Sequence, residues 1–144
     1  MKTMVLCLLM MISHLALADA KLMKPILESN DVLFTALLGT DQKVVSSSAA
    51  KLVAKIIQGK DRKLIATTPD LKKISAKNSK AQNLELYANF MDGFLPLAKE
   101  HGLGDDYLVY YCPMVKKYWL QNSKVHKKTQ NVYAQEMLEC GGKV

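Results

Sequence analysis

Helical periodicity between Leu22 and Gly102 limits the possible folds more than any other feature of the sequence. Apolar residues recur there every three or four positions, so that they would share one face of an α-helix. The clearest stripe consists of Val44, Val45, Ser48, Ala49, Leu52, Val53, Ile56 and Ile57. The segment from Gly39 to Asp41 ends the helix before this stripe and caps the helix that carries it. Gly59 is the natural end of that second helix.

Two more helices are predicted before Gly102. In the third, Pro69 fits the first turn of a helix, and residues 60–67 could extend into this helical stretch. Thr68 would cap this helix, and Leu71 and Ile74 would be its core contacts.

The fourth helix begins at Ser79 and Gln82, which match the pattern of a capping box. Gly93 and Pro96 lie inside this helix. Proline removes a backbone hydrogen bond and crowds the preceding turn, so these two residues predict a kink or a local break.

The residue types change after Gly104. Residues 107–111 and 118–120 are β-prone, and residues 113–117 would form the turn between two strands. Residues 133–138 predict one or two helical turns before the glycines at 141 and 142. The expected fold is therefore mainly α, a helical bundle of about four helices with a small C-terminal β-hairpin and tail.

The first twenty residues have the pattern of an export signal. Lys2 precedes an apolar run from Met4 to Leu17, and Ala16, Ala18 and Ala20 fit a small-residue cleavage site. We therefore expect a signal peptide at 1–20 and a single exported helical domain at 21–144, periplasmic or secreted. The apolar run is shorter than the ~20 residues that span a bilayer, so no stable membrane insertion is expected.

The formal net charge of +7 comes from lysines that are spread along the chain rather than gathered in one block. This distribution is typical of a solvated basic surface, and an exported domain rarely meets nucleic acid, so no nucleic-acid partner is expected. The sequence also contains no G-x-S-x-G, no H-E-x-x-H and no phosphate-binding glycine loop. We therefore do not expect an enzyme.

Two short sulfur motifs lie in the C-terminal region, residues 107–142. The first pairs Cys112 with Met114, and the second pairs Met137 with Cys140. Because Cys7 would leave with the signal peptide, these motifs hold both cysteines of the mature chain. Thiolate and thioether are soft ligands that suit Cu(I) and suit Mg²⁺ or Ca²⁺ poorly. The four residues therefore predict a soft-metal site, with Cu(I) as the expected ion.

Two alternatives remain open for the same residues. Cys112 and Cys140 could form a disulfide that closes a loop of about 28 residues and stabilises the fold by ~3 to 4 kcal/mol. In that case the methionines would fill the core, and the protein would be a structural or interaction module without metal. One cysteine could instead carry thiol redox chemistry, which would need a partly exposed, acidic thiol near a positive charge. His126 is a conceivable further ligand, although a single loop histidine is usually solvated.

Four segments of this region form a recognisable series: Tyr111–Met114, Tyr118–Leu120, Asn131–Tyr133 and Met137–Gly141. Their order resembles the CPM, YWL, NPY and MLxCG pattern of the bacterial domain of unknown function 3347 family, with Val132 at the position of the proline. The resemblance implies heavy-metal handling, because that family occurs as small exported proteins and at the C-termini of periplasmic adaptors of copper and silver efflux systems. A metal ion and such an adaptor, or another exported protein, are therefore the expected partners.

Overall fold

The computed structural model describes the backbone of residues 2–144 and the side chains of residues 19–144. Four α-helices come first: α1 (Lys2–Leu38), α2 (Gln42–Gln58), α3 (Arg62–Ala66) and α4 (Lys80–His101), with a 3₁₀ turn η1 (Leu71–Lys73) before α4. Three strands follow, β1 (Tyr107–Cys112), β2 (Lys117–Asn122) and β3 (Gly142–Lys143), with a second 3₁₀ turn η2 (Gln135–Met137) before β3. The predicted fold class, mainly α with a C-terminal β-hairpin, is confirmed.

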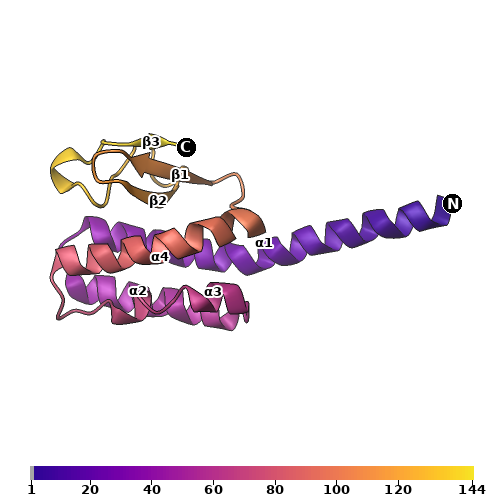
Figure 1. Ribbon diagram of the computed structural model, residues 1–144, viewed down its shortest axis with the longest axis horizontal. Coiled ribbons are helices and arrows are strands. Elements are labelled where there is room, and N and C mark those ends of the chain that lie inside the picture. Colours follow the sequence, from indigo (N-terminus) through magenta and orange to yellow (C-terminus); the bar gives the residue numbers. More distant parts are fainter. Residues whose placement is uncertain (1) are drawn as a thin grey trace.

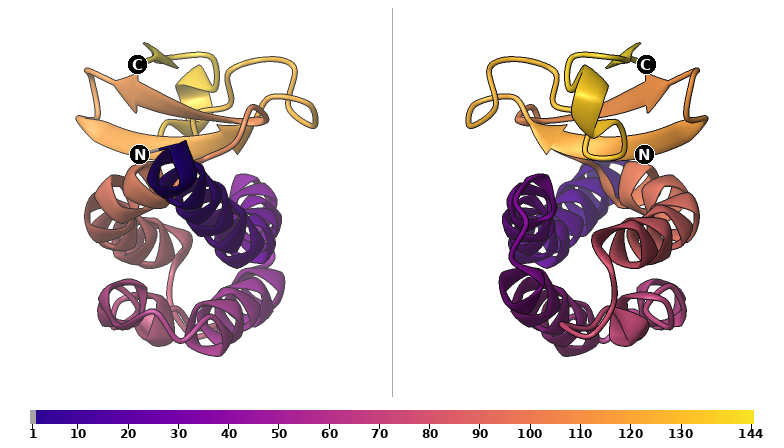
Figure 2. Two further views of the ribbon diagram at one scale, coloured as in Figure 1. Left: turned by 90° about the vertical axis from the view of Figure 1, so that its right-hand side faces the viewer. Right: turned by 90° about the vertical axis from the view of Figure 1, so that its left-hand side faces the viewer.

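The elements form three layers (Figures 1 and 2). The sheet and the C-terminal segment form one outer layer, α1 and α4 form the middle layer, and α2, α3 and η1 form the other outer layer. The largest fully buried side chains come from the middle layer and the sheet: Trp119, Tyr87, Phe34, Phe90 and Phe94. In the outer layer, Trp119 stacks on Tyr110, and Tyr133 of the C-terminal segment packs on Tyr87 of α4 with ring centroids 6.2 Å apart, so an aromatic contact joins this layer to α4.

Helix α1 continues without interruption across the predicted signal boundary at residue 20. The first half of α1 extends away from the bundle in Figure 1. The side chains of residues 1–18, on which the signal prediction rests, lie outside the described residues, so cleavage stays a prediction. Among the residues that the structure describes, none of the helices has the length and apolar character to cross a membrane.

The helix starts that the sequence predicts are present. The Asp41 side chain accepts a hydrogen bond from the Lys43 backbone N–H at 2.9 Å and so caps α2. Ser79 and Gln82 form both hydrogen bonds of a capping box at the start of α4. The apolar stripe of α2 is narrower than predicted, because Val44 and Ile57 are about half exposed.

Gly59 ends α2 for a reason that differs from the predicted one. Its φ of −69° is ordinary helical backbone, whereas the following residue, Lys60, has the left-handed φ of 59°. A Cβ atom at Gly59 would collide with the side chain of Leu22 in α1. Glycine at this position therefore allows α1 and α2 to approach each other closely.

Two predictions in the middle of the chain are wrong. Thr68 does not cap a helix that begins at Pro69, because its hydroxyl donates back to the Ile65 carbonyl at 2.8 Å and belongs to the end of α3. The segment after Pro69 forms only η1, although Leu71 and Ile74 are buried as predicted.

Helix α4 continues through Pro96 without the break that its sequence predicts. The proline ring lies on the exposed side of α4, where a helix carbonyl without an N–H donor can accept hydrogen bonds from water.

The sheet has the strand order β2-β1-β3, and both pairings are antiparallel. Tyr110 lies opposite Trp119 and Tyr111 opposite Tyr118 in the predicted hairpin. The C-terminal tail contains a strand that its residues do not predict, because Gly142 pairs with Tyr111 as part of β3. This third strand returns the C-terminal segment to the end of β1.

Candidate functional site

The two sulfur motifs meet where β1 ends and β3 begins. Cys112 is the last residue of β1, and Cys140 lies two residues before the Gly142 that pairs with Tyr111. The Cys112 and Cys140 Sγ atoms are 2.9 Å apart, and both cysteines are free thiols. Strand β3 therefore brings together two cysteines that are 28 residues apart in the sequence.

Asn131 holds the segment that carries Cys140. Its side chain is fully buried, and its Nδ2 donates to the Cys140 carbonyl at 2.9 Å. Its Oδ1 accepts from the Tyr133 N–H at 3.0 Å, and its own N–H donates to the Leu138 carbonyl at 2.6 Å. One asparagine thus fixes both the start and the end of the 131–140 loop.

Gln121, in β2, orders the loop that leads to Asn131. Its buried amide donates to the carbonyls of His126 and Lys128, at 3.3 and 2.7 Å. Its Oε1 accepts from the Trp119 indole N–H at 3.3 Å and from the Gln130 N–H at 3.1 Å. Because this amide satisfies four partners, the predicted polar loop at 123–131 has a defined course.

Gly141 lies against the thiol pair, where no side chain fits. Its φ is +117°, and a Cβ atom would lie 2.7 Å from Cη2 of Trp119 and 2.9 Å from the Tyr111 carbonyl. The same Cβ would lie 3.4 Å from Cβ of Cys112. The protein's single tryptophan therefore lies directly beside the pair.

The pKa values of the two thiols are shifted in opposite directions. Burial raises the pKa of Cys112, but hydrogen bonds from the Cys140 thiol, from the Val115 and Met114 N–H groups and from Asn131 outweigh it, so the pKa is lowered. The pKa of Cys140 is raised, because its thiol donates to Cys112, because it is partly desolvated, and because it faces the charge on Cys112. The pair therefore favours one shared proton, with the negative charge on Cys112.

We expect the reduced pair to lose its protons in two separate steps, the first below and the second above the usual range of a cysteine thiol. Thiolate ultraviolet absorbance followed against pH measures both steps. Cys112→Ser and Cys140→Ser should each leave a single step. A wild-type titration with one step at the usual cysteine pKa would contradict the shared-proton arrangement.

The same shifts predict how stability depends on pH. The lowered pKa of Cys112 stabilises the fold above the unfolded pKa, and this contribution is lost as pH falls through the folded pKa. The raised pKa of Cys140 acts in the opposite sense, with stability lost as pH rises through the folded pKa. From these two groups, the reduced protein should be most stable near the unfolded cysteine pKa of ~8.5.

The two motif methionines lie at the surface. Met114 is 68% exposed and Met137 is 44% exposed, whereas Met23 and Met91 are buried in the core. The alternative in which Met114 and Met137 fill the core is therefore wrong. Within the described residues, no three His, Cys, Asp or Glu side chains converge as a metal-binding group.

The tyrosines near the motifs form a packing layer. Tyr110 stacks on Trp119 with ring centroids 5.6 Å apart, and Tyr111 packs on Tyr118 at 4.6 Å. Tyr133 lies edge-on to Trp119 at 6.4 Å and donates its hydroxyl to the Tyr118 carbonyl. These contacts stiffen the hairpin on which Cys112 lies.

His126 is not a ligand of the thiol pair. Its Nε2 lies 3.1 Å from Oδ1 of Asp31 in α1, and its ring packs edge-on against Phe34 with centroids 5.2 Å apart. The side chain is only 8% exposed, so the expectation of a solvated loop histidine is wrong. Asp31 and His126 instead tie the 123–131 loop to the bundle.

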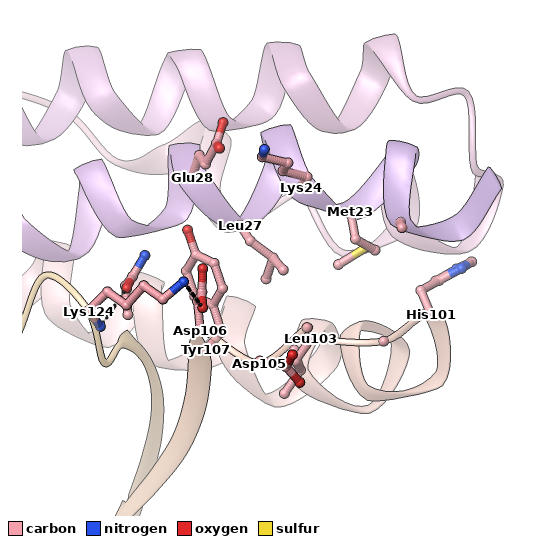
Figure 3. A pocket seen from close by; sticks show the side chains of 14 residues that line it. Met23, Lys24, Leu27, Glu28, His101, Leu103, Asp105, Asp106, Tyr107 and Lys124 are labelled. Carbon is pink, nitrogen blue, oxygen red and sulfur yellow. Dashed lines mark hydrogen bonds and ion pairs between the residues drawn. The ribbon is translucent and has the colours of Figure 1, made fainter. Parts of the chain in front are cut away.

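A pocket lies elsewhere, between α1 and the loop from α4 to β1. Its volume is about 620 Å³, and none of the four sulfur residues lines it. Figure 3 shows acidic and basic side chains on its walls, with Lys124 bound to Asp106 at 2.8 Å. Charges of both signs therefore balance within this pocket, which gives it no clear ligand class.

Comparison with known proteins adds no assignment, because no family model, curated protein or solved structure matches this chain. The resemblance of the four C-terminal segments to the domain of unknown function 3347 family therefore stays a prediction. The thiol pair itself is the feature from which a function can be argued.

Proposed function

We propose that the protein is a small exported carrier of a soft metal ion, with Cu(I) as its ion. Cys112 and Cys140 would supply two thiolates, and Met114 and Met137 would supply thioether ligands at the surface. The role would be sequestration, or delivery to an efflux system through a periplasmic adaptor or another exported partner. The observation that carries the proposal is the 2.9 Å separation of two thiols from distant parts of the chain.

The chemistry of the donors favours a soft ion. Two thiolates together with thioethers select Cu(I) over hard ions such as Mg²⁺. Loss of a thiol proton accompanies binding, and the lowered pKa of Cys112 makes this loss easier. With thiolate–metal bonds of about 2.3 Å, the two sulfurs would lie roughly 4 Å apart. A rotamer change of the partly exposed Cys140 would supply this increase of about 1 Å.

The positions of the methionines suit ligand exchange. Met114 follows Cys112 by two residues, and Met137 precedes Cys140 by three. An ion held by a buried and a partly exposed thiolate leaves the protein most easily through intermediate ligands at the surface, and thioethers bind Cu(I) more weakly than thiolates do. The exposure of both methionines supports a carrier rather than a permanent structural metal site.

An anaerobic Cu(I) titration of the reduced mature protein against a competing chelator tests the proposal. We expect one ion per chain. Cys112→Ser or Cys140→Ser should weaken binding by more than about 100-fold, ~2.7 kcal/mol. Met114→Leu or Met137→Leu should weaken it by about tenfold, ~1.4 kcal/mol.

Met91→Leu is the matched control, because Met91 is a buried core methionine. It should leave Cu(I) affinity unchanged. Equal Cu(I) affinity in Met114→Leu, Met137→Leu and Met91→Leu would show that the thioethers are not ligands. Absence of stoichiometric binding in the reduced wild-type protein would overturn the proposal.

The same sulfur separation also favours a second candidate, a disulfide-stapled interaction module. Two thiols in contact in an oxidising compartment are poised to form a disulfide. Free-thiol counting on protein taken from its native compartment separates the candidates. No free thiols, together with no Cu(I) binding after reduction, would favour the module.

A further inference from the structure

The two sulfurs of the pair differ in their access to solvent. Cys112 is fully buried, under Gly141 and beside Trp119. Cys140 is partly exposed, and its neighbours Met137 and Leu138 are 44% and 45% exposed. A reagent that approaches the pair therefore meets Cys140 first.

They also differ in their place in the fold. Cys112 is the last residue of β1 and pairs with Lys117 of β2. Cys140 lies outside the strands, between η2 and β3. In thiol–disulfide exchange, the sulfur that the reductant can reach is the one attacked, and the other sulfur is the leaving group.

We propose that Cys112 and Cys140 form a directional thiol–disulfide exchange site, in which a thiol reductant attacks the exposed Cys140 sulfur and buried Cys112 is the leaving group. The incoming thiolate forms an S–S bond with Cys140 Sγ while the Cys140–Cys112 bond breaks. The electron pair of that bond remains on Cys112 Sγ, which leaves as a thiolate. A second reductant thiol then attacks the reductant's own sulfur in the mixed disulfide and releases Cys140 as a thiol.

These two steps transfer two electrons, so that two thiols are oxidised to one disulfide and the protein disulfide becomes two thiols. Attack on Cys112 is disfavoured, because this residue is fully buried. Exchange would convert the site from an oxidised form that cannot bind metal to a reduced form that can, since only the reduced pair offers two thiolates. This regulatory consequence rests on the proposed function, whereas the exchange chemistry does not.

Glutathione is the probe. The oxidised mature protein is mixed with excess reduced glutathione in buffer with a metal chelator, quenched with acid at early times and mapped by peptide mass spectrometry. We expect glutathione on Cys140. Adducts on Cys112, equal adducts on both cysteines, or a pair that neither oxidises nor exchanges would overturn the proposal.

Single-cysteine variants give a second measurement that does not depend on trapping an intermediate. Cys112→Ser leaves Cys140 alone, and Cys140→Ser leaves Cys112 alone. With an aromatic disulfide reagent, Cys112→Ser should react at least about tenfold faster than Cys140→Ser, and unfolding in urea should abolish the difference. Equal rates in the folded variants would contradict the inference. Because no step involves metal, the Cu(I) titration can fail or succeed independently of these results.

Discussion

Gly141→Ala should lower the free energy of unfolding by about 2–4 kcal/mol, the largest effect of any single methyl group that we expect in this protein. The left-handed φ of +117° is strained for alanine. The added Cβ would also lie 2.7 Å from Cη2 of the fully buried Trp119 and 2.9 Å from the backbone oxygen of Tyr111. Neither neighbour is the free end of a flexible side chain, so the C-terminal segment must move instead. Urea denaturation followed by tryptophan fluorescence measures the loss.

Gly142→Ala is the matched control for this prediction. Gly142 is the next residue, but a Cβ atom there would meet nothing within 4 Å, and its φ lies outside the left-handed region. We expect its effect on stability to be within about 0.5 kcal/mol. Equal stability of the two variants would show that Gly141 is not closely packed against the thiol pair.

The Gly141→Ala variant should also affect the chemistry of the pair. Movement of the C-terminal segment would separate Cys140 from Cys112 and would remove the hydrogen bond that lowers the pKa of Cys112. Its first thiol ionisation should therefore return toward the usual cysteine range, and the Gly142→Ala titration should match that of the wild-type protein.

Features set by neighbouring residues could be predicted from the sequence. The Ser79 and Gln82 capping box and the Asp41 cap need only residues within one turn, and both are present. The β-prone residues 107–111 and 118–120 likewise predicted the β1–β2 hairpin, because neighbouring strands joined by a short turn form a local structure. These elements account for most of the fold.

Features set by distant residues could not be predicted in the same way. Asp31 and His126 are 95 residues apart, and neither belongs to a motif that would have paired them. The pairing of β3 with β1 depends on the course of the loop between residues 123 and 141, which the buried amides of Gln121 and Asn131 set. A short Gly-Gly strand carries no apolar alternation, so its sequence gave no sign of a third strand.

The candidate site lies between these two cases. Its cysteines were found from their motifs, but their separation and their unequal acidities depend on the tertiary contacts of Asn131 and Gly141. Asn131 belongs to one of the four recognised segments, so a signal was present. Only the structure shows that this asparagine holds the two sulfur motifs together.

Asn131→Ala should lower the free energy of unfolding by about 2–4 kcal/mol and should also raise the first pKa of the thiol pair. The substitution leaves the Tyr133 N–H and the Cys140 carbonyl without their partners at partly buried positions, where each unsatisfied group costs about 1–3 kcal/mol. It also removes one of the hydrogen bonds that lower the pKa of Cys112. Denaturation and the thiolate titration measure the two effects on the same protein.

Asn83→Ala separates a general loss of stability from an effect on the thiols. Asn83 is also fully buried, and its amide makes hydrogen bonds to Gln42 in α2 and to Ser75 and Asn78 between η1 and α4, none of which belongs to the sheet or the C-terminal segment. We expect Asn83→Ala to lose a similar free energy of unfolding while both thiol ionisations remain as in the wild-type protein. If Asn131→Ala likewise left the ionisations unchanged, Asn131 would be a structural residue alone, and the acidity of Cys112 would depend on the turn N–H groups and Cys140.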